Sequence, residues 1–303
     1  MKTNLYSMIA VAVLATAAGA QPQPETRPIG YTTEPRAADV GILPGHSLLV
    51  YVITGGSRFG AVDLGSGVFM PIGQHTPPDV GGGLVQGPRS LLTLAFSGDL
   101  DAIDPVNGKT SFVGSTGLHD CSKPDSLPDP KCANVIGQLG EALYATDFAQ
   151  NLYTVNPVTG EATQIGSTGI PQLTFVPLSN ACPNCVYNES LFSFGGKLYA
   201  NFATATRTSS GPVIGTVPQL WEINVTTGVA TPGPLLVNAN GNPAIGLTSI
   251  VNVNGIIYAF NAASGQVLTV DVTTGQTTAV TALHSNAGLI GGATPVQSQF
   301  PPQ

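Results

Sequence analysis

The feature of this sequence that most constrains its fold is a short turn pattern that recurs along most of its length. An Asp or Asn is followed four residues later by Gly, and the runs on either side are rich in β-branched residues. Gly suits the positive φ that closes a tight hairpin turn, and the Asp or Asn side chain can accept a hydrogen bond from the backbone N–H two residues on. The copies are Asp63–Gly67, Asp104–Gly108, Asn156–Gly160, Asn224–Gly228 and Asp271–Gly275. Calcium sites are a weaker interpretation, since one oxygen donor per turn falls short of the six to eight ligands that calcium takes.

The spacing of these turns indicates a β-propeller. Successive turn glycines are 41, 52, 68 and 47 residues apart, and a four-stranded propeller blade takes roughly 40–50 residues. The last repeat shows all four strands, with Asn254-Gly255 as the hairpin turn between the first two. These strands are expected at Leu247–Val253, Ile256–Asn261, Gln266–Val272 and Gln276–Thr281.

The two ends of the repeat region predict how the ring closes. The first repeat, Leu48–Gly73, lacks a first strand, whereas Gly288–Val296 follows the last repeat and resembles a first strand with no blade behind it. If the C-terminal strand completes the first blade, no open sheet edge remains at the closure. We therefore predict an all-β fold, a five-bladed β-propeller. Six blades remain an alternative if Pro171–Ser190 contains further strands.

The N-terminal residues are typical of an export signal. Lys2 precedes the apolar run Leu5–Ala17, and Ala18-Gly19-Ala20 has the small residues of a cleavage site, so we expect the mature chain to begin at Gln21. A membrane anchor is the alternative, but the run is short for a span. The expected organisation is a signal peptide at 1–20, a Pro-rich linker at 21–46, the propeller at 47–297 and a tail at 298–303, in a secreted or periplasmic protein.

Composition excludes several classes of partner. Only 9% of the residues are charged, the net charge is −7, and the 10 Lys and Arg form no cluster. Nucleic-acid binding and polybasic binding to a membrane surface both need a positive footprint. No later segment approaches about 20 continuous apolar residues, so we expect no membrane insertion of the mature chain. We expect a monomer without a cofactor, with a glycan or a protein as its extracellular ligand.

The four cysteines are expected to form disulfides, because an exported chain meets an oxidising compartment. Three pairings are possible, and we favour Cys121–Cys132 and Cys182–Cys185, each local to one loop. A zinc site is the alternative, since Cys182-Pro-Asn-Cys185 has ligand spacing, but the ten residues between Cys121 and Cys132 do not fit it.

The long insertions gather on one face of the predicted ring. The turns between first and second strands, and between third and fourth strands, are tight, whereas Gly114–Ala133, Ser167–Asn188 and Thr204–Pro218 lie on the opposite face. Both cysteine pairs fall in these insertions. Because loops on a rigid scaffold commonly carry binding sites, we predict a ligand or partner on this loop face.

Three histidines also fall on the predicted loop face. His75, His119 and His284 each come just after the last strand of a repeat, and Asp120 adjoins His119. If these residues converge they could hold a ligand or a metal ion, since imidazole and carboxylate are common metal ligands. The alternative is three separate, solvated loop histidines.

Catalytic signatures are absent from the sequence. It has no Gly-x-Ser-x-Gly elbow, phosphate-binding loop or His-Glu-x-x-His motif, so the catalytic residues, if there are any, stay unknown. Carboxylates from different blades could still cleave a glycoside, with Asp99, Asp101, Asp147 and Glu222 as candidates. We expect a non-catalytic binding or surface protein. The alternatives are an extracytoplasmic hydrolase or lyase, which could be metal-assisted, and a purely structural envelope protein.

One repeat carries a resemblance to known proteins. Leu152–Gly166, LYTVNPVTGEATQIG, resembles the repeat of secreted bacterial β-propeller proteins, many of which have no assigned activity, and Asn224–Thr231 and Asp271–Thr278 look like the same unit. The resemblance implies a propeller over roughly Ser47–Gln297. It says little about activity, because one propeller scaffold hosts many functions.

Overall fold

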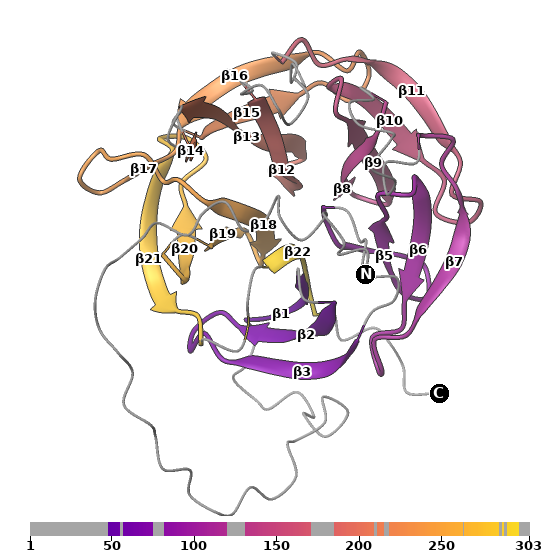
Figure 1. The fold of residues 1–303 in the computed structure, drawn as a ribbon, viewed down its shortest axis with the longest axis horizontal. Coiled ribbons are helices and arrows are strands. Elements are labelled where there is room, and N and C mark those ends of the chain that lie inside the picture. The colour runs from indigo at the N-terminus through magenta and orange to yellow at the C-terminus, as the bar shows by residue number, and fades with distance from the viewer. Residues whose placement is uncertain are drawn as a thin grey trace, which may run out of the picture.

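The structure is a computed structural model that describes residues 48–54, 57–74, 82–119, 131–170, 185–208, 211–214, 218–262, 264–284, 287 and 290–296. Within these ranges the regular structure is all β, with 22 strands in five small sheets that surround a central axis (Figure 1). A search of the same ranges for a helix able to span a membrane finds none. The predicted signal peptide, linker and tail lie outside the described residues.

The second and third blades show the regular arrangement of four antiparallel strands, ordered from the axis to the rim. The second contains β4 (Val85–Gln86), β5 (Leu91–Leu94), β6 (Asp99–Ile103) and β7 (Thr110–Ser115). The third contains β8 (Ala133–Leu139), β9 (Ala142–Asp147), β10 (Asn151–Val155) and β11 (Ala162–Ser167). The outermost strand of each blade runs along the rim of the ring (Figure 1).

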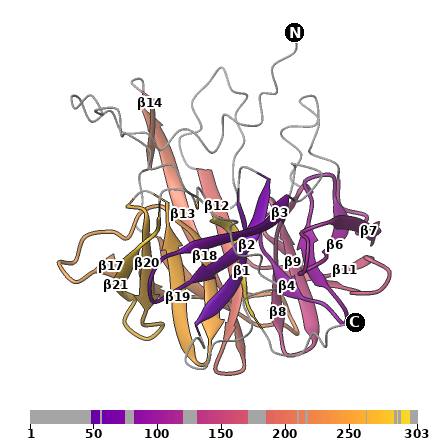
Figure 2. The ribbon, with the colours of Figure 1, turned by 90° about the horizontal axis from the view of Figure 1, so that it is seen from below.

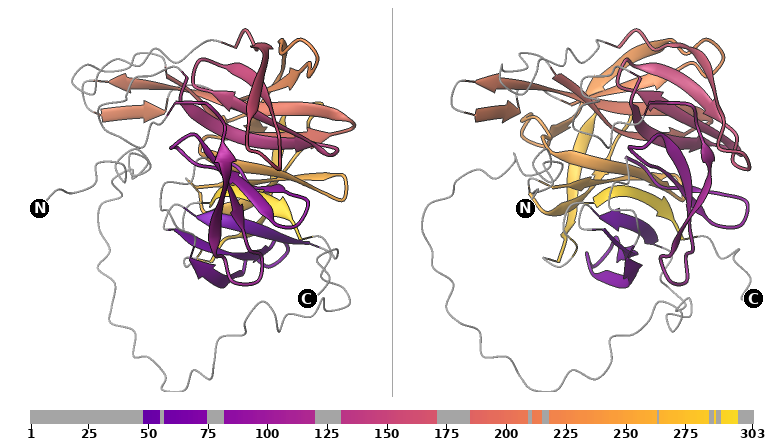
Figure 3. Two further views of the ribbon diagram at one scale, coloured as in Figure 1. Left: turned by 90° about the vertical axis from the view of Figure 1, so that its right-hand side faces the viewer. Right: turned by 45° about the vertical axis from the view of Figure 1, so that its right-hand side comes forward.

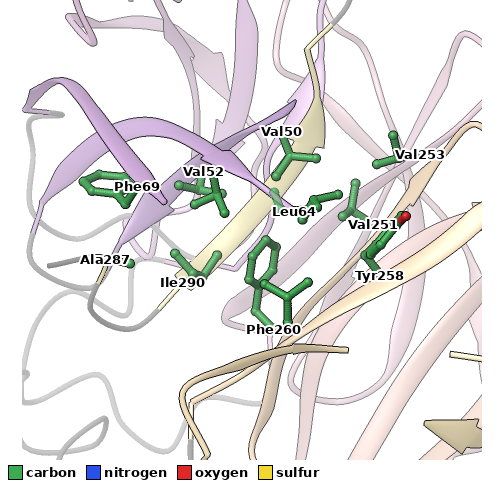
Figure 4. Close-up of a cluster of buried hydrophobic side chains, with 13 residues drawn as sticks. Val50, Val52, Leu64, Phe69, Val251, Val253, Tyr258, Phe260, Ala287 and Ile290 are labelled. Carbon is green, nitrogen blue, oxygen red and sulfur yellow. The ribbon is translucent and has the colours of Figure 1, made fainter. Parts of the chain in front are cut away.

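The first blade is completed by the C-terminal strand. Its order is β22 (Ile290–Pro295), β1 (Leu49–Thr54), β2 (Arg58–Asp63) and β3 (Phe69–Gln74). β22 is antiparallel to β1. Figure 4 shows Ile290 in one buried cluster with Val52 of β1 and Phe260 of the fifth blade, so the joint is closed by apolar packing as well as by hydrogen bonds. The predicted five-bladed ring and its closure are confirmed.

The fourth and fifth blades depart from the simple pattern. The fourth contains β12 (Cys185–Phe194), β13 (Lys197–Thr208), β15 (Gln219–Ile223) and β16 (Ala230–Leu235), and the fifth contains β18 (Leu247–Val253), β19 (Ile256–Asn261), β20 (Gln266–Val270) and β21 (Gln276–Ala282). β14 (Gly211–Ile214) pairs with the far end of β13, and β17 (Val237–Asn238) pairs in parallel with β21. The long interval between the third and fourth turn glycines therefore includes an extension of the sheet, which stands out from the ring (Figures 2 and 3).

The five recurring turns share one hydrogen-bond geometry. In each, a side-chain oxygen of the Asp or Asn accepts a hydrogen bond of 2.8–2.9 Å from the backbone N–H two residues on. The Gly N–H donates to the carbonyl of the same Asp or Asn, and the five glycines have φ between 73° and 83°. Such a φ is costly for any residue with a Cβ, so the turn requires glycine.

The turn glycines also contact the neighbouring blade. A Cβ on Gly160 would lie 2.6 Å from the carbonyl carbon of Gly114 in β7, and one on Gly228 would lie 2.9 Å from that of Gly166 in β11. A Cβ on Gly67 or Gly275 would overlap a backbone carbonyl oxygen of β21 or β16, and one on Gly108 would lie 3.3 Å from the backbone of Gly73 in β3. Each turn therefore packs on the outermost strand of the preceding blade, and the sequence motif lies at all five blade junctions.

Candidate functional site

The innermost strands of all five blades surround a pocket on the axis, which we call the axial pocket. Its volume is about 250 Å³, and its walls come from the C-terminal parts of β4, β8, β12, β18 and β22. This volume holds roughly eight water molecules at about 30 Å³ each, which limits a ligand to a small molecule. The pocket lies beside the turns between first and second strands, so it is on the face opposite to the predicted loop face.

Each blade contributes one uncharged polar side chain to this pocket. The other lining residues include Leu191, Phe192 and Ile250, whose side chains are buried in the core clusters between blades, so the surface exposed to the pocket is more polar than apolar. The inner strands pack against neighbouring blades on both sides, so they are apolar until they approach the solvent at the strand end. The five polar residues, which we call the polar ring, are Gln86, Gln138, Ser193, Asn252 and Thr294.

Hydrogen bonds from the long members of the polar ring join adjacent blades. Gln138 Oε1 accepts from the backbone N–H of Gln86 at 3.2 Å, and Gln86 Nε2 donates to the carbonyl of Pro295 at 2.7 Å. Asn252 Nδ2 donates to the carbonyl of Ser193 at 2.8 Å. The side chains that line the pocket are therefore partly fixed by the contacts that hold the ring together.

Among the residues that the structure describes, none that lines the axial pocket has an ionisable side chain. Every lining residue is apolar, a glycine, an amide or a hydroxyl. General acid–base catalysis needs a group that exchanges a proton near the working pH, and recognition of a charged ligand needs an opposite charge. This surface is therefore suited to hold a neutral molecule by hydrogen bonds.

The predicted histidine site is described only in part. His75 and Asp120 lie outside the described residues. His119 is exposed in the connection between the second and third blades, whereas His284 is exposed in the connection between the fifth and first, where its backbone N–H donates to the carbonyl of Gly67 at 3.1 Å. Among the described residues, no three His, Cys, Asp or Glu gather closely enough to hold a metal ion.

The cysteines are likewise described only in part. Cys132 is fully buried beside the start of β8 and is disulfide-bonded. Cys121 and Cys182 lie outside the described residues, and Cys185 is described only as the first residue of β12. The pairing of the four cysteines stays a prediction.

The four candidate carboxylates come from three blades, and none of them lines the axial pocket. Asp147 is fully buried at the end of β9 and accepts hydrogen bonds from the backbone and side chain of Asn151 and from Tyr153 Oη, at 2.7–2.8 Å. Burial raises the pKa of the Asp147 carboxyl, although these hydrogen bonds oppose the shift. Glu222 forms an exposed ion pair with Lys197 at 2.9 Å. Both side chains thus have structural partners.

Comparison with known proteins finds similarity only to solved structures. No family model matches the sequence, and no curated protein matches it. Among solved structures, the glutaminyl cyclase of Myxococcus xanthus has a TM-score of 0.43 and 14% identity, covering 82% of this chain and 74% of its own. A chain of a nidogen/laminin complex has a TM-score of 0.46 and 12% identity, covering 83% and 98%. The class that the structure defines is the five-bladed β-propeller.

Sequence reasoning missed the polar ring, although a signal for it exists. In three blades the polar residue stands two positions before the first residue of the turn: Gln138 before Gly140, Ser193 before Gly195, and Asn252 before Asn254. Each interrupts an apolar run at the point where the strand leaves the core. Aligning these three repeats on these turns, rather than on the turn glycines, would have found these three members. Gln86 stands one position before Gly87, and no such turn joins the strand of Thr294 to β1.

Proposed function

We propose that this protein is an exported, non-catalytic binding propeller and that its axial pocket holds a small, uncharged ligand. The observation that carries the proposal is the polar ring, in which all five blades direct one amide or hydroxyl to the same pocket. Polar groups that converge on one pocket can fix the orientation of a small molecule and determine its specificity. The rival activity, an extracytoplasmic hydrolase or lyase, would need an acid and a base from elsewhere than this pocket.

The loop face stays a second proposed surface, for a glycan or protein partner of a monomeric propeller. One described feature supports it. β13 begins at the turn Gly195-Gly196 and continues past the rest of its blade, so its pairing with β14 builds a β extension on the face opposite to the axial pocket (Figure 2). A macromolecular partner on that face and a small ligand in the pocket do not exclude one another.

A ligand screen tests the pocket proposal. The purified chain is titrated with small charged and uncharged compounds of up to about a dozen non-hydrogen atoms, by calorimetry and ligand-observed NMR. We expect uncharged compounds to bind with an affinity that salt leaves unchanged, because no charge lines the pocket. Ser193→Leu fills the pocket and should abolish binding, whereas the matched Ser111→Leu on the exposed side of β7 should not. Binding confined to charged compounds, or unaffected by Ser193→Leu, would refute the proposal.

A further inference from the structure

The turn between β9 and β10 ends on a residue whose backbone conformation favours glycine. Gln150 has a φ of 65°, which is costly for any residue with a Cβ. The corresponding turns of the first, second and fifth blades place Ser57, Gly98 and Gly265 at this position, with φ between 60° and 81°. The carbonyls of Gly98 and Gln150 also make the same contact, since each accepts from the N–H of a threonine just after the outermost strand. The turn therefore needs a positive φ but has no need of a glutamine side chain.

The amide of Gln150 is enclosed in the protein without a hydrogen-bond partner. The residue is 0% exposed, and neither Nε2 nor Oε1 forms a hydrogen bond to any residue that the structure describes. Its neighbours Phe148 and Leu152 pack in the cluster between the third and fourth blades. Turns between second and third strands lie on the loop face, so this amide is far along the blade from the axial pocket. A buried amide left unpaired costs its full desolvation penalty, so we expect a partner.

Two more buried amides in the same two blades have an unpaired nitrogen. Asn134 Nδ2 and Asn201 Nδ2 are the other enclosed side-chain atoms that lack a partner within the described ranges. Asn134 stands in β8 where the pairing with β9 is irregular, and Gln150 precedes β10 on the other side of β9. In Asn201 of β13, Oδ1 accepts a hydrogen bond from Ser190 Oγ, which leaves only the nitrogen. The unpaired amides of the described residues are thus confined to the third and fourth blades.

We infer that the junction between the third and fourth blades contains a binding site for internal water, and that Gln150 holds at least one water molecule there. Water both donates and accepts hydrogen bonds, so it can satisfy the nitrogen and the oxygen of one amide. An anion could accept from Nε2 but could not donate to Oε1, and a metal ion would have the reverse difficulty. Buried water typically forms about three hydrogen bonds to polar groups that the protein leaves unpaired.

This water site gives the glutamine a role that the turn alone does not. Glycine would adopt the φ of this position without cost, but it has no group to hold water. Asn134 and Asn201 each need only an acceptor, which water also supplies. The inference goes beyond the proposed function, because Gln150 takes no part in the axial pocket.

A high-resolution crystal structure of the full chain, together with NMR of the same chain, tests the inference. We expect ordered water roughly 2.7–3.2 Å from Gln150 Nε2 or Oε1, and nuclear Overhauser transfer from water to the Nε2 hydrogens. Gln150→Met keeps the length of the side chain and the cost of positive φ but removes the amide. We expect it to lower the midpoint of thermal unfolding, because the water loses its hydrogen bonds. The matched Gln164→Met, at an exposed position of β11, should leave the midpoint unchanged.

Two results would overturn the inference. One is a Gln150 amide that is hydrogen-bonded only to protein atoms, with no water beside it in the crystal and no transfer in solution. The other is a higher midpoint for Gln150→Met, since removing a buried polar group that has no partner stabilises the folded state. The ligand screen of the axial pocket does not involve Gln150, so the proposed function can fail while this inference stands, and the reverse.

Discussion

The contact between Gly114 and the turn at Gly160 yields the sharpest prediction for stability. Gly114 lies in β7, and its φ is not positive, so alanine is acceptable to the backbone at this position. A Cβ there would nevertheless overlap the carbonyl oxygen of Thr159, far inside the 3.0 Å that real Cβ atoms keep. The obstacle is backbone on both sides, so no side chain can rotate away. Gly114→Ala must therefore push the turn of the third blade off the rim of the second.

The magnitude follows from a comparison with two other glycines. Gly117 has φ of 77° and nothing within 4 Å of the place where a Cβ would lie, so Gly117→Ala measures the cost of positive φ alone, about 1–2 kcal/mol. Gly114→Ala measures overpacking alone, typically about 1–3 kcal/mol and at the upper end here because backbone must move. Gly160→Ala incurs both costs, since its φ is 80° and its Cβ would lie 2.6 Å from Gly114, and we expect about 3–5 kcal/mol.

Urea unfolding at 25 °C, followed by tryptophan fluorescence and circular dichroism, gives the three losses in unfolding free energy. We expect Gly160→Ala to be the least stable, Gly114→Ala next, and Gly117→Ala closest to the parent. A Gly114→Ala chain as stable as the parent, or more stable than Gly117→Ala, would show that the turns do not pack on the neighbouring blade as described. The motif would then define hairpins without joining blades.

Three further predictions concern closure and pH. Ending the chain at Gly288 removes β22 and should sharply lower the midpoint of thermal unfolding, whereas ending it at Gln297 should not. The pKa of Asp147 is raised in the folded chain, so unfolding free energy should fall as pH rises from the ordinary value of 3.8 through the raised one, and Asp147→Asn should flatten that fall in urea titrations. Backbone N–H groups lower the pKa of Asp271, so its contribution should be lost as pH falls below 3.8, and Asp271→Asn should remove this acid sensitivity while keeping the turn.

The blade number was predictable because it is encoded locally. A turn that needs glycine at positive φ marks itself in the sequence, and five such turns mark five blades. The strands expected at Leu247–Val253 and Ile256–Asn261 match β18 and β19, because Asn254-Gly255 leaves little freedom in the hairpin. The extension of β13 is not evident from sequence, since Thr204–Pro218 has the composition of a loop and β14 has no turn signal comparable to those of the blades.

The candidate site was less predictable because it is assembled from distant parts of the chain. Gln86 and Thr294 are 208 residues apart in sequence and meet only once the ring has closed. Reasoning from insertions and histidines instead favoured the loop face, much of which lies outside the described residues. Local signals identify elements, whereas a site on the axis depends on how all five elements are placed at once.

The axial pocket and the stability of the ring depend on the same contacts. The amide of Gln86 links the second blade to the C-terminal strand, and that of Asn252 links the fifth blade to the fourth. Both side chains therefore stay in place whether or not a ligand is present. Binding then carries no additional entropy cost for ordering them. Apolar packing alone could close the ring. Placing amides at the strand ends adds a fixed polar surface where the inner strands reach solvent, which is why we place the ligand there rather than elsewhere on the described surface.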